Sequence, residues 1–292
     1  MKLSKYSLIL LIAMTASCKS NPSSSNKTGN FETLSENKTS IFIEGKTFDN
    51  ELDFTSFADK ILIGKALYNT SIKYDITFIN CVFKKPVLAY KNSVDNAHNI
   101  TSFWGHVSFI ECKFMDTVSF RASKFLGQCN FTKSEFFSTV NFEESSFNLN
   151  AFFNWCSFEK QVRFQNSFFN QKANFMDTTF SENVSFQSSI FNSDAQFSSS
   201  KFYKYADFSL TQHRGNSFYD FSEFFGTLDL SHSFFSNSFS INNNKHKNIL
   251  FNNTKFMGKT SFIELDFSKD LNFDGSFFLL KRPKTNSIAQ EN

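Results

Sequence analysis

The sequence predicts an all-β fold, a parallel β-solenoid whose coils repeat with a period of 22 and whose four short sides each point one phenylalanine inward. Three observations lead to this prediction. Phenylalanine accounts for 44 of the 292 residues. These residues recur with alternating steps of five and six, as in "VSFIECKFMDTVSFRASKFLGQCNF" at residues 107–131. Where two charged residues between 107 and 204 have a spacing of 22, their signs are opposite.

The composition limits the class of protein. Glycine and proline number only 9 and 3, which excludes collagen-like chains and disordered chains rich in these two residues. The mean hydropathy is −0.30, so the phenylalanines are set among many Ser, Asn, Lys and Thr residues. A water-soluble fold with a phenylalanine core follows from this mixture.

The N-terminus has the features of a secretion signal. Lys2 and Lys5 precede an apolar run at residues 8–14, which is too short to span a bilayer but suits a signal peptide. The run leads to "TASC", which ends at Cys18 and resembles the lipobox of bacterial lipoproteins. The polar segment 19–30 that follows resembles the tether of such proteins. The alternative is an ordinary signal peptide in which Cys18 is incidental.

The resemblance to lipoproteins implies a location in the cell and an interaction with a membrane. It implies lipid attachment at Cys18 and a place in the bacterial cell envelope, with Lys19 rather than Asp favouring the outer membrane. Cleavage before Cys18 lowers Lys plus Arg from 30 to 28 against 27 Asp plus Glu, a formal net charge of +1. This balance supports neither nucleic-acid binding nor an acidic mimic of DNA.

The alternating steps of five and six arise from two interleaved series of phenylalanines, each with a period of eleven residues. One runs from 103 to 202 and the other from 109 to 208, and all ten positions of each are Phe. Two residues before most of them lies a small or β-branched residue, which shares the inward face of an extended segment. A helical supercoil also has an eleven-residue period, but the abundance of Phe, Val, Ser and Thr favours strands.

The charges set the length of a coil, because like charges on stacked neighbours are unfavourable. At a spacing of 22 there are six opposite pairs and no like pair: Glu111/Lys133, Lys113/Glu135, Arg121/Glu143, Lys160/Glu182, Lys172/Asp194 and Glu182/Lys204. A spacing of 11 gives two opposite pairs and one like pair, and a spacing of 33 gives two like pairs only. The period of the coil is therefore 22, rather than 11 or 33.

The unit resembles the motif of the pentapeptide-repeat proteins. "ADFSL" (206–210), "ANFMD" (173–177) and "CNFTK" (129–133) match its small residue two places before a central Leu or Phe. The resemblance implies a right-handed quadrilateral β-helix. This chain has one extra residue in every second pentapeptide, so we expect a coil that is wider at two corners.

The repeat divides the chain into segments. The expected segments are a signal peptide (1–17), a polar tether (18–30), an irregular solenoid part (31–102) with a loop near 90–100, a regular solenoid (103–241), a loop (242–248), final coils (249–280) and a tail (281–292). A milder defect is expected near 211–216, where His213 occupies a Phe position. After the predicted loop, the regular spacing of the phenylalanines resumes one residue early, at Phe251.

No residue pattern in the sequence points to catalysis. Four cysteines, at 81, 112, 129 and 156, occupy the small position of the repeat and are predicted to be buried free thiols. The spacing between His213 and His246 corresponds to one and a half coils, so these two residues should lie on opposite walls. We therefore expect no metal, no cofactor and no enzymatic activity.

The candidate binding residues are outward aromatics. Phe152 and Trp155 flank the inward Phe153, with polar residues expected above and below them. They form either a small binding patch or ordinary scattered surface aromatics.

The sequence thus predicts a non-catalytic, lipid-anchored scaffold or protein-interaction surface in the cell envelope, with an unidentified protein or glycan partner. One alternative is a DNA mimic that protects topoisomerases, as some pentapeptide-repeat proteins do; the signal peptide and the near-neutral charge oppose it. The other is a glycan-binding or glycan-active β-solenoid, which would need an aromatic track or convergent carboxylates.

Overall fold

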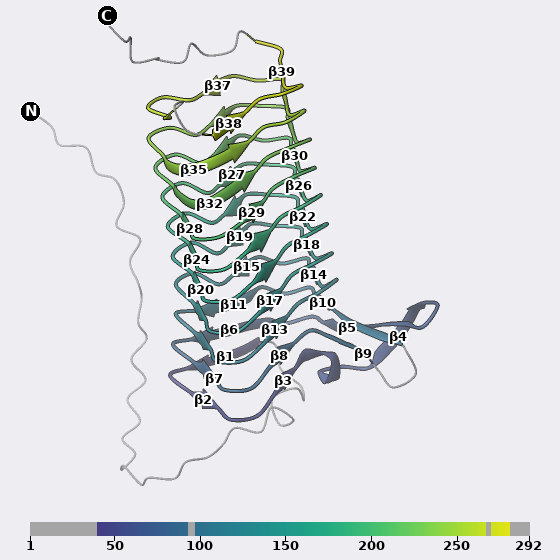
Figure 1. The fold of residues 1–292 in the computed structure, drawn as a ribbon. Helices are drawn as coiled ribbons and strands as arrows, with labels where there is room; N and C mark the ends of the chain where they lie inside the picture. Colours follow the sequence, from purple (N-terminus) through teal and green to yellow (C-terminus); the bar gives the residue numbers. More distant parts are fainter. Residues whose placement is uncertain (1–39, 93–96, 267–269, 281–292) are drawn as a thin grey trace, which may run out of the picture.

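The computed structural model describes residues 40–92, 97–266 and 270–280. It shows a parallel β-solenoid, in which successive coils stack along one axis (Figure 1). Four walls run along this axis, and most of their strands are only two residues long. Short strands suffice because each wall contributes one inward ring per coil before the chain turns a corner.

The first wall is a ten-stranded parallel sheet. Its strands, in spatial order, are β1 (Ser40–Glu44), β6 (Asp75–Ile79), β11 (Val107–Ile110), β15 (Cys129–Asn130), β19 (Ala151–Phe152), β23 (Ala173–Asn174), β27 (Ala195–Gln196), β31 (Ser217–Phe218), β34 (Phe239–Ser240) and β37 (Thr260–Ser261).

The second and third walls belong to one 17-stranded sheet. The second wall contains β2 (Thr47–Phe48), β7 (Val82–Phe83), β12 (Lys113–Phe114), β16 (Glu135–Phe136), β20 (Ser157–Phe158), β24 (Thr179–Phe180) and β28 (Lys201–Phe202). The third contains β3 (Leu52–Asp53), β8 (Val87–Leu88), β13 (Val118–Ser119), β17 (Val140–Asn141), β21 (Val162–Arg163), β25 (Val184–Ser185), β29 (Ala206–Asp207) and β38 (Asp270–Asn272). Two longer strands, β32 (Glu223–Asp229) and β35 (Lys245–Leu250), pass through both walls.

The fourth wall is a twelve-stranded sheet. From the C-terminal end it contains β39 (Phe277–Phe278), β36 (Lys255–Phe256), β33 (Phe234–Phe235), β30 (Gln212–His213), β26 (Ile190–Phe191), β22 (Phe168–Phe169), β18 (Ser146–Phe147), β14 (Lys124–Phe125), β10 (His98–Phe103), β5 (Leu67–Ile72) and β4 (Lys60–Gly64), with β9 (Tyr90–Asn92) paired to β10.

The strand register confirms the predicted period of 22. Cys129 pairs with Ala151 in the first wall, and Glu135 pairs with Ser157 in the second. The inward rings stack along each wall: the centroid of the Phe153 ring lies 5.4 Å from that of Phe131 and 4.9 Å from that of Phe175. Rings of different walls meet edge-on, as Phe153 and Phe164 do, so aromatic contacts run both along the axis and across the interior.

Three of the six charge pairs found in the sequence form ion pairs between coils. Glu111 lies 2.9 Å from Lys133, Lys113 lies 3.1 Å from Glu135, and Arg121 lies 3.8 Å from Glu143. These exposed contacts contribute little free energy, about 0.2–1 kcal/mol each. Their value in this chain is as markers of the register.

A tight turn follows each inward residue of the series that begins at Phe109. In one example, the amide of Ser123 donates to the carbonyl oxygen of Phe120 at 3.0 Å, and Ala122 between them has a φ of 52°. A positive φ at the third residue of a four-residue turn defines the type II class. The other two corners of the coil, such as the one from Phe125 to Cys129, contain the extra residue of the six-residue step.

A buried ladder of hydroxyl groups ties these turns together from coil to coil. At the small position two residues before the phenylalanines of the 103–202 series, most side chains donate to the carbonyl oxygen 25 residues earlier; the donors are Ser134, Ser145, Cys156, Ser167, Thr178, Ser189, Ser200, Ser222 and Ser233. Several also accept a hydrogen bond from the amide 22 residues earlier, as Ser200 does from Thr178. The ladder explains why this position mostly holds Ser or Thr while the equivalent position in the other series is mostly apolar.

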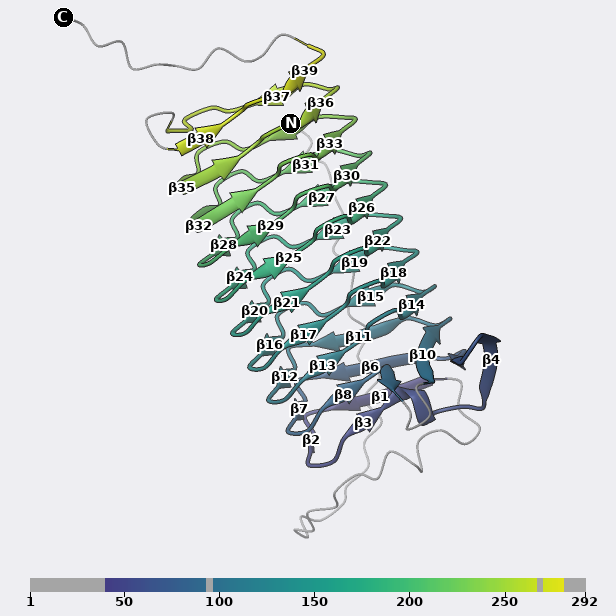
Figure 2. The ribbon, with the colours of Figure 1, turned by 45° about the vertical axis from the view of Figure 1, so that its right-hand side comes forward.

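The N-terminal part contains two antiparallel hairpins, where the sequence predicted irregular solenoid. β4 pairs with β5, and β9 pairs with β10. The predicted loop near 90–100 is therefore partly strand, because His98 pairs with Asn92. A short 3-10 helix, η2 (Phe54–Ser56), precedes β4. The hairpins project beyond the walls at one end of the solenoid (Figures 1 and 2).

The predicted loop at 242–248 is wrong over most of its length, since Lys245 already begins β35. The missing residue is absorbed by a bulge: Phe224 pairs with His246 at a spacing of 22, whereas Thr227 pairs with Asn248 at a spacing of 21. The predicted defect near 211–216 leaves the register intact, because Gln212 pairs with Ile190 and Ser217 pairs with Ala195. His213 simply replaces a phenylalanine in its column.

The four cysteines within the described residues are buried free thiols, as predicted. Burial raises the pKa of the Cys129 thiol and raises that of Cys156 to about 12, which disfavours the reactive thiolate. Cys81 and Cys112 lie in adjacent coils, since the amide of Lys113 donates to the carbonyl oxygen of Cys81 at 2.8 Å.

Candidate binding surface

The break in the repeat between β32 and β35 produces a local surface feature. Lys247 of β35 lies opposite both Phe225 and Gly226 of β32, because the register shifts by one residue between Phe224 and Thr227. A bulge of this kind redirects side chains and is common next to functional sites. Gly226 is suited to the bulge: a Cβ placed there would lie 2.1 Å from the carbonyl oxygen of Lys204.

Two exposed aromatic rings stack beside the bulge. The centroids of Tyr203 and Phe225 are 4.8 Å apart with their planes at 14°, and the two residues are 43% and 46% exposed. Their spacing of 22 places one a coil above the other, on the outer surface of the second wall. A stacked pair of this exposure presents a flat apolar platform, which is a common anchor for a partner.

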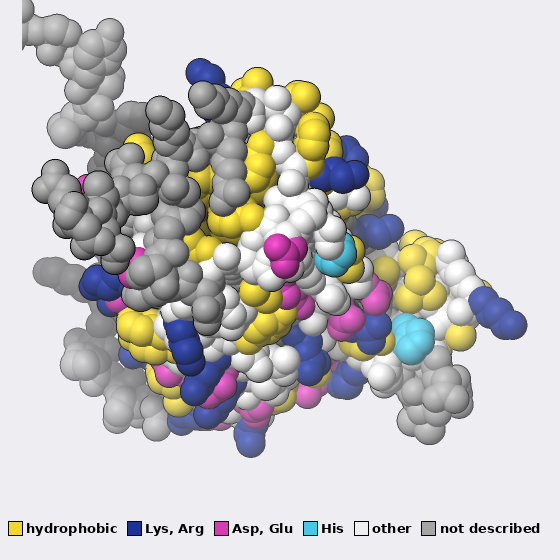
Figure 3. All heavy atoms as spheres, turned by 45° about the horizontal axis from the view of Figure 1, so that its top comes forward, with side chains coloured by type: hydrophobic (Ala, Val, Ile, Leu, Met, Phe, Trp, Pro, Cys, Tyr) yellow, Lys and Arg dark blue, Asp and Glu magenta, His cyan; other side chains and the backbone are white. Residues whose placement is uncertain are grey.

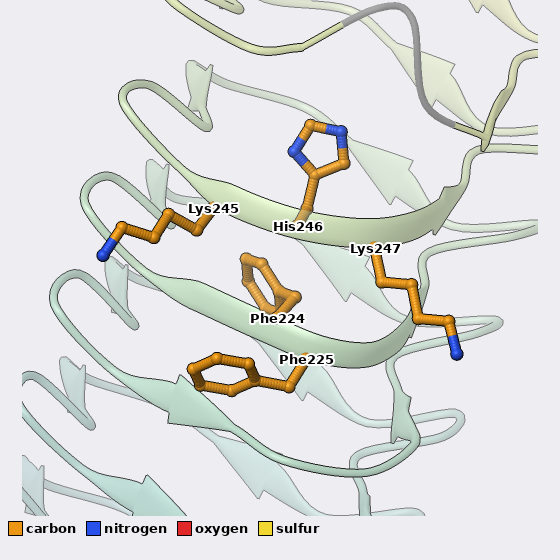
Figure 4. Close-up of a pocket in the computed structure, with 5 residues that line it drawn as sticks. All are labelled: Phe224, Phe225, Lys245, His246 and Lys247. Carbon is orange, nitrogen blue, oxygen red and sulfur yellow. The ribbon is translucent and has the colours of Figure 1, made fainter.

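A cavity of about 270 Å³ adjoins this platform. Its lining consists of Phe224, Phe225, Lys245, His246 and Lys247 (Figure 4). The side chains of Lys245 and Lys247 extend to opposite sides, whereas His246 and Phe224 point inward from neighbouring coils (Figure 4). The lining of the cavity thus combines aromatic rings with the side chains of two lysines.

The charged groups around the cavity are suited to binding. Lys245 is paired with Glu223 at 3.6 Å. Beside the platform, the Tyr205 hydroxyl donates to Asp229 at 2.5 Å, and burial together with this carboxylate raises the pKa of Tyr205. The site can stack a flat or apolar group and pair with an anion.

The two histidines lie on opposite walls, as predicted. His246 is 4% exposed, and its Nε2 lies 3.1 Å from the carbonyl oxygen of Asp266. His213 is fully buried, with Nδ1 2.8 Å from Ser217 Oγ and Nε2 3.2 Å from Thr211 Oγ1. Burial lowers the pKa of His213 to about 3, so the ring is neutral. Within residues 40–92, 97–266 and 270–280, no cluster of three potential metal ligands occurs.

The aromatics singled out from the sequence lie elsewhere. Phe152 is half-buried on β19, between Asn130 and Asn174 in the neighbouring coils, as expected from the period. Trp155 is 55% exposed at a tight turn with a φ of 59°. Cys18 lies outside the described residues. The pair Tyr203 and Phe225 was not predicted from the sequence, although their spacing of 22 is a signal that could have identified them.

Comparison of the chain with protein-family models, with curated proteins and with solved structures finds no match. The part of the chain that the structure describes contains no helical segment with the length and hydropathy needed to cross a bilayer. The geometry is compatible with a pentapeptide-repeat fold, because it combines a β-solenoid, stacked phenylalanine columns and a coil period of 22.

Proposed function

We propose that this protein is a non-catalytic, lipid-anchored β-solenoid of the pentapeptide-repeat type that serves as a scaffold or interaction surface in the bacterial cell envelope. The observation that carries the proposal is the platform of Tyr203 and Phe225 beside the 270 Å³ cavity, at the break in an otherwise regular stack. A surface built only from the regular repeat would recur in every coil, whereas this one is confined to a single place.

The proposed address rests on the N-terminal sequence. The basic start, the short apolar run and "TASC" together support lipid attachment at Cys18, and the polar segment 19–30 supports a tether. Two or more acyl chains attach a protein stably to a membrane, whereas one chain does not. Lys19 after the cysteine supports the outer membrane.

The surface charge supports a protein or glycan partner over a nucleic acid. Acidic and basic side chains are intermingled over the face seen in Figure 3. Nucleic-acid binding needs a basic stripe, and mimicry of DNA needs an acidic one. The glycan-binding alternative has one observation in its favour, because stacked exposed rings next to ammonium groups also suit an acidic sugar.

The test is site-specific photo-crosslinking in whole cells. A photoreactive amino acid at Tyr203 should give adducts, while the same residue at Ser181, one coil earlier in the same outward column, should give none. Phe225→Ala should remove the Tyr203 adduct, because it removes half of the platform. A protein adduct supports the leading proposal and a sugar adduct supports the alternative. Equal labelling at 203 and 181 would show that this surface is not the binding site.

A further inference from the structure

The hairpin of β4 and β5 is poorly covered by the rest of the described chain. Its strands are antiparallel, with Lys60 opposite Thr70 and Leu62 opposite Tyr68. It projects from the fourth wall at the end of the solenoid that also holds β1 and β2 (Figures 1 and 2). All five residues of β4 are exposed.

Three consecutive aliphatic side chains of this strand are open to solvent. Ile61 is 60% exposed, Leu62 is 59% exposed and Ile63 is 49% exposed. Successive residues of a strand point to opposite faces, so exposure of all three means that neither face of the strand packs on the solenoid. β4 also ends the order of its sheet. An exposed apolar edge strand is a hazard unless something covers it.

The polar residues around these aliphatics are mainly basic. Lys60 and Lys65 flank them within "KILIGK", and both are exposed; Asp59 lies just before Lys60. In Figure 3, hydrophobic side chains gather on the projecting part at the right, with basic side chains at its outer edge. Lysine ammonium groups beside a buried apolar segment suit the head-group region of an anionic bilayer.

The hairpin lies at the end of the molecule from which the chain leads to the expected anchor. Ser40 begins β1 at that end, and Cys18 precedes it in the sequence by a spacing of 22 (40 minus 18). A segment of this length spans at most about 75 Å even when fully extended. This step rests on the lipid anchor of the proposed function, which would keep this end of the solenoid within that distance of the membrane surface.

We infer that residues 60–66 form a second, peripheral membrane contact, in which the aliphatic side chains of 61–63 enter the boundary between head groups and acyl chains. Amphipathic helices at membrane interfaces bury their apolar face about 5–10 Å deep, and we expect a comparable depth for this strand. A second copy of the chain is the competing occupant. Edge-to-edge pairing of two β4 strands would cover backbone groups but leave both side-chain faces in water, whereas a bilayer surrounds both faces. The lipid surface therefore fits the exposure better.

The test uses the full lipidated chain with a polarity-sensitive NBD label at Ala66→Cys, in the turn after β4. The four other cysteines of the described residues are buried and should stay unlabelled in the native protein. On vesicles of phosphatidylethanolamine and phosphatidylglycerol, the label should shift to the blue, brighten severalfold and be quenched by brominated lipids. A label at Lys160→Cys on the solenoid wall is the control and should not respond.

The triple variant Ile61→Ser, Leu62→Ser and Ile63→Ser should abolish the NBD response but still sediment with the vesicles, with an unchanged melting temperature. Lys60→Glu with Lys65→Glu should weaken the response on anionic vesicles and have little effect on phosphatidylcholine. An NBD signal that is the same with and without vesicles overturns the inference. So does a signal that depends on protein concentration without lipid, which would indicate a second copy. Failure to sediment would instead contradict the anchor at Cys18.

Discussion

A histidine takes the place of a phenylalanine in the fourth wall with little change in geometry. The ring centroid of His213 lies 4.7 Å from that of Phe191 and 4.5 Å from that of Phe235, so the column is continuous. Both ring nitrogens have hydroxyl partners, from Ser217 and Thr211. The neutral ring is thus accommodated, whereas a charged ring would have to be stabilised in a phenylalanine core.

This substitution makes stability depend on pH. Burial lowers the pKa of His213 from 6.5 to about 3. Below pH 6.5 the unfolded chain binds a proton that the folded chain does not, so the free energy of unfolding falls as the pH falls from 6.5 to 3, by up to about 1.4 kcal/mol per pH unit. Urea unfolding of the wild type and of His213→Phe at several pH values measures this. The variant should lose less stability on acidification, and parallel pH profiles would contradict the buried neutral ring.

At the scale of the element, the turns depend on a hydroxyl group that no strand pattern would suggest. Ser200 Oγ donates to the carbonyl oxygen of Phe175 at 2.6 Å and accepts from the amide of Thr178 at 3.2 Å. Both backbone groups lie in the preceding coil, where water does not reach them. One side chain thus satisfies two buried groups of a turn.

Removing this hydroxyl should be costly. Ser200→Ala should lower the free energy of unfolding by about 1–3 kcal/mol, because it leaves a buried amide and a buried carbonyl without this partner. Ser181→Ala on the outer surface is the matched control and should change it by less than about 0.5 kcal/mol. Urea denaturation monitored by circular dichroism measures both. Ser200→Cys should fall between them, since Cys156 donates to the carbonyl oxygen of Phe131 at the same position of another coil. Equal effects of Ser200→Ala and Ser181→Ala would refute the role of the ladder.

The period, the columns and the register of the regular part could all be predicted, because in a solenoid a single spacing fixes every stacked neighbour. Charged residues such as Glu111 and Lys133, which form an ion pair between coils, revealed that spacing in the sequence. The hairpins could not be predicted in the same way, because residues 60–72 lack the regular phenylalanine spacing. The pairing of β4 with β5 joins strands that are neighbours in the sequence. The bulge opposite Lys247 could not be predicted from the sequence either. The sequence indicates that a residue is missing near 242–248 but not which corner loses it, and the cavity depends on that choice.

At the scale of the whole molecule, the first described strand, β1, and the projecting hairpin lie at one end of the rod, and the candidate binding surface lies toward the other. β4 is near the N-terminal end of the stack, whereas β32 and β35 are near the C-terminal end (Figure 1). The proposed binding platform would therefore stand away from the membrane, separated from it by the regular coils between.

Attachment of the whole molecule to the membrane should depend on the sulfur atom of Cys18. Cys18→Ala should move the protein from the membrane fraction to the soluble fraction, because the thiol that would carry the lipid is lost. Fractionation after a high-salt wash, followed by immunoblotting, measures this. Cys129→Ala is a suitable control, since that cysteine is buried in the first wall and takes no part in attachment. Retention of Cys18→Ala in washed membranes would rule out the lipid anchor.

The coils of the regular part are equivalent tiers of one stack, and this has a consequence for how the gene can change. Along the regular part, each tier meets the next through the same rings and the same turn hydroxyls, as in the run from Phe131 through Phe153 to Phe175. A duplication of 22 codons in the gene would insert one more tier whose neighbours above and below are already correct. A deletion of the same size would close the stack again. If the solenoid is anchored as proposed, the distance between the proposed platform and the membrane is a trait that a lineage can lengthen or shorten in uniform steps, without redesigning either end.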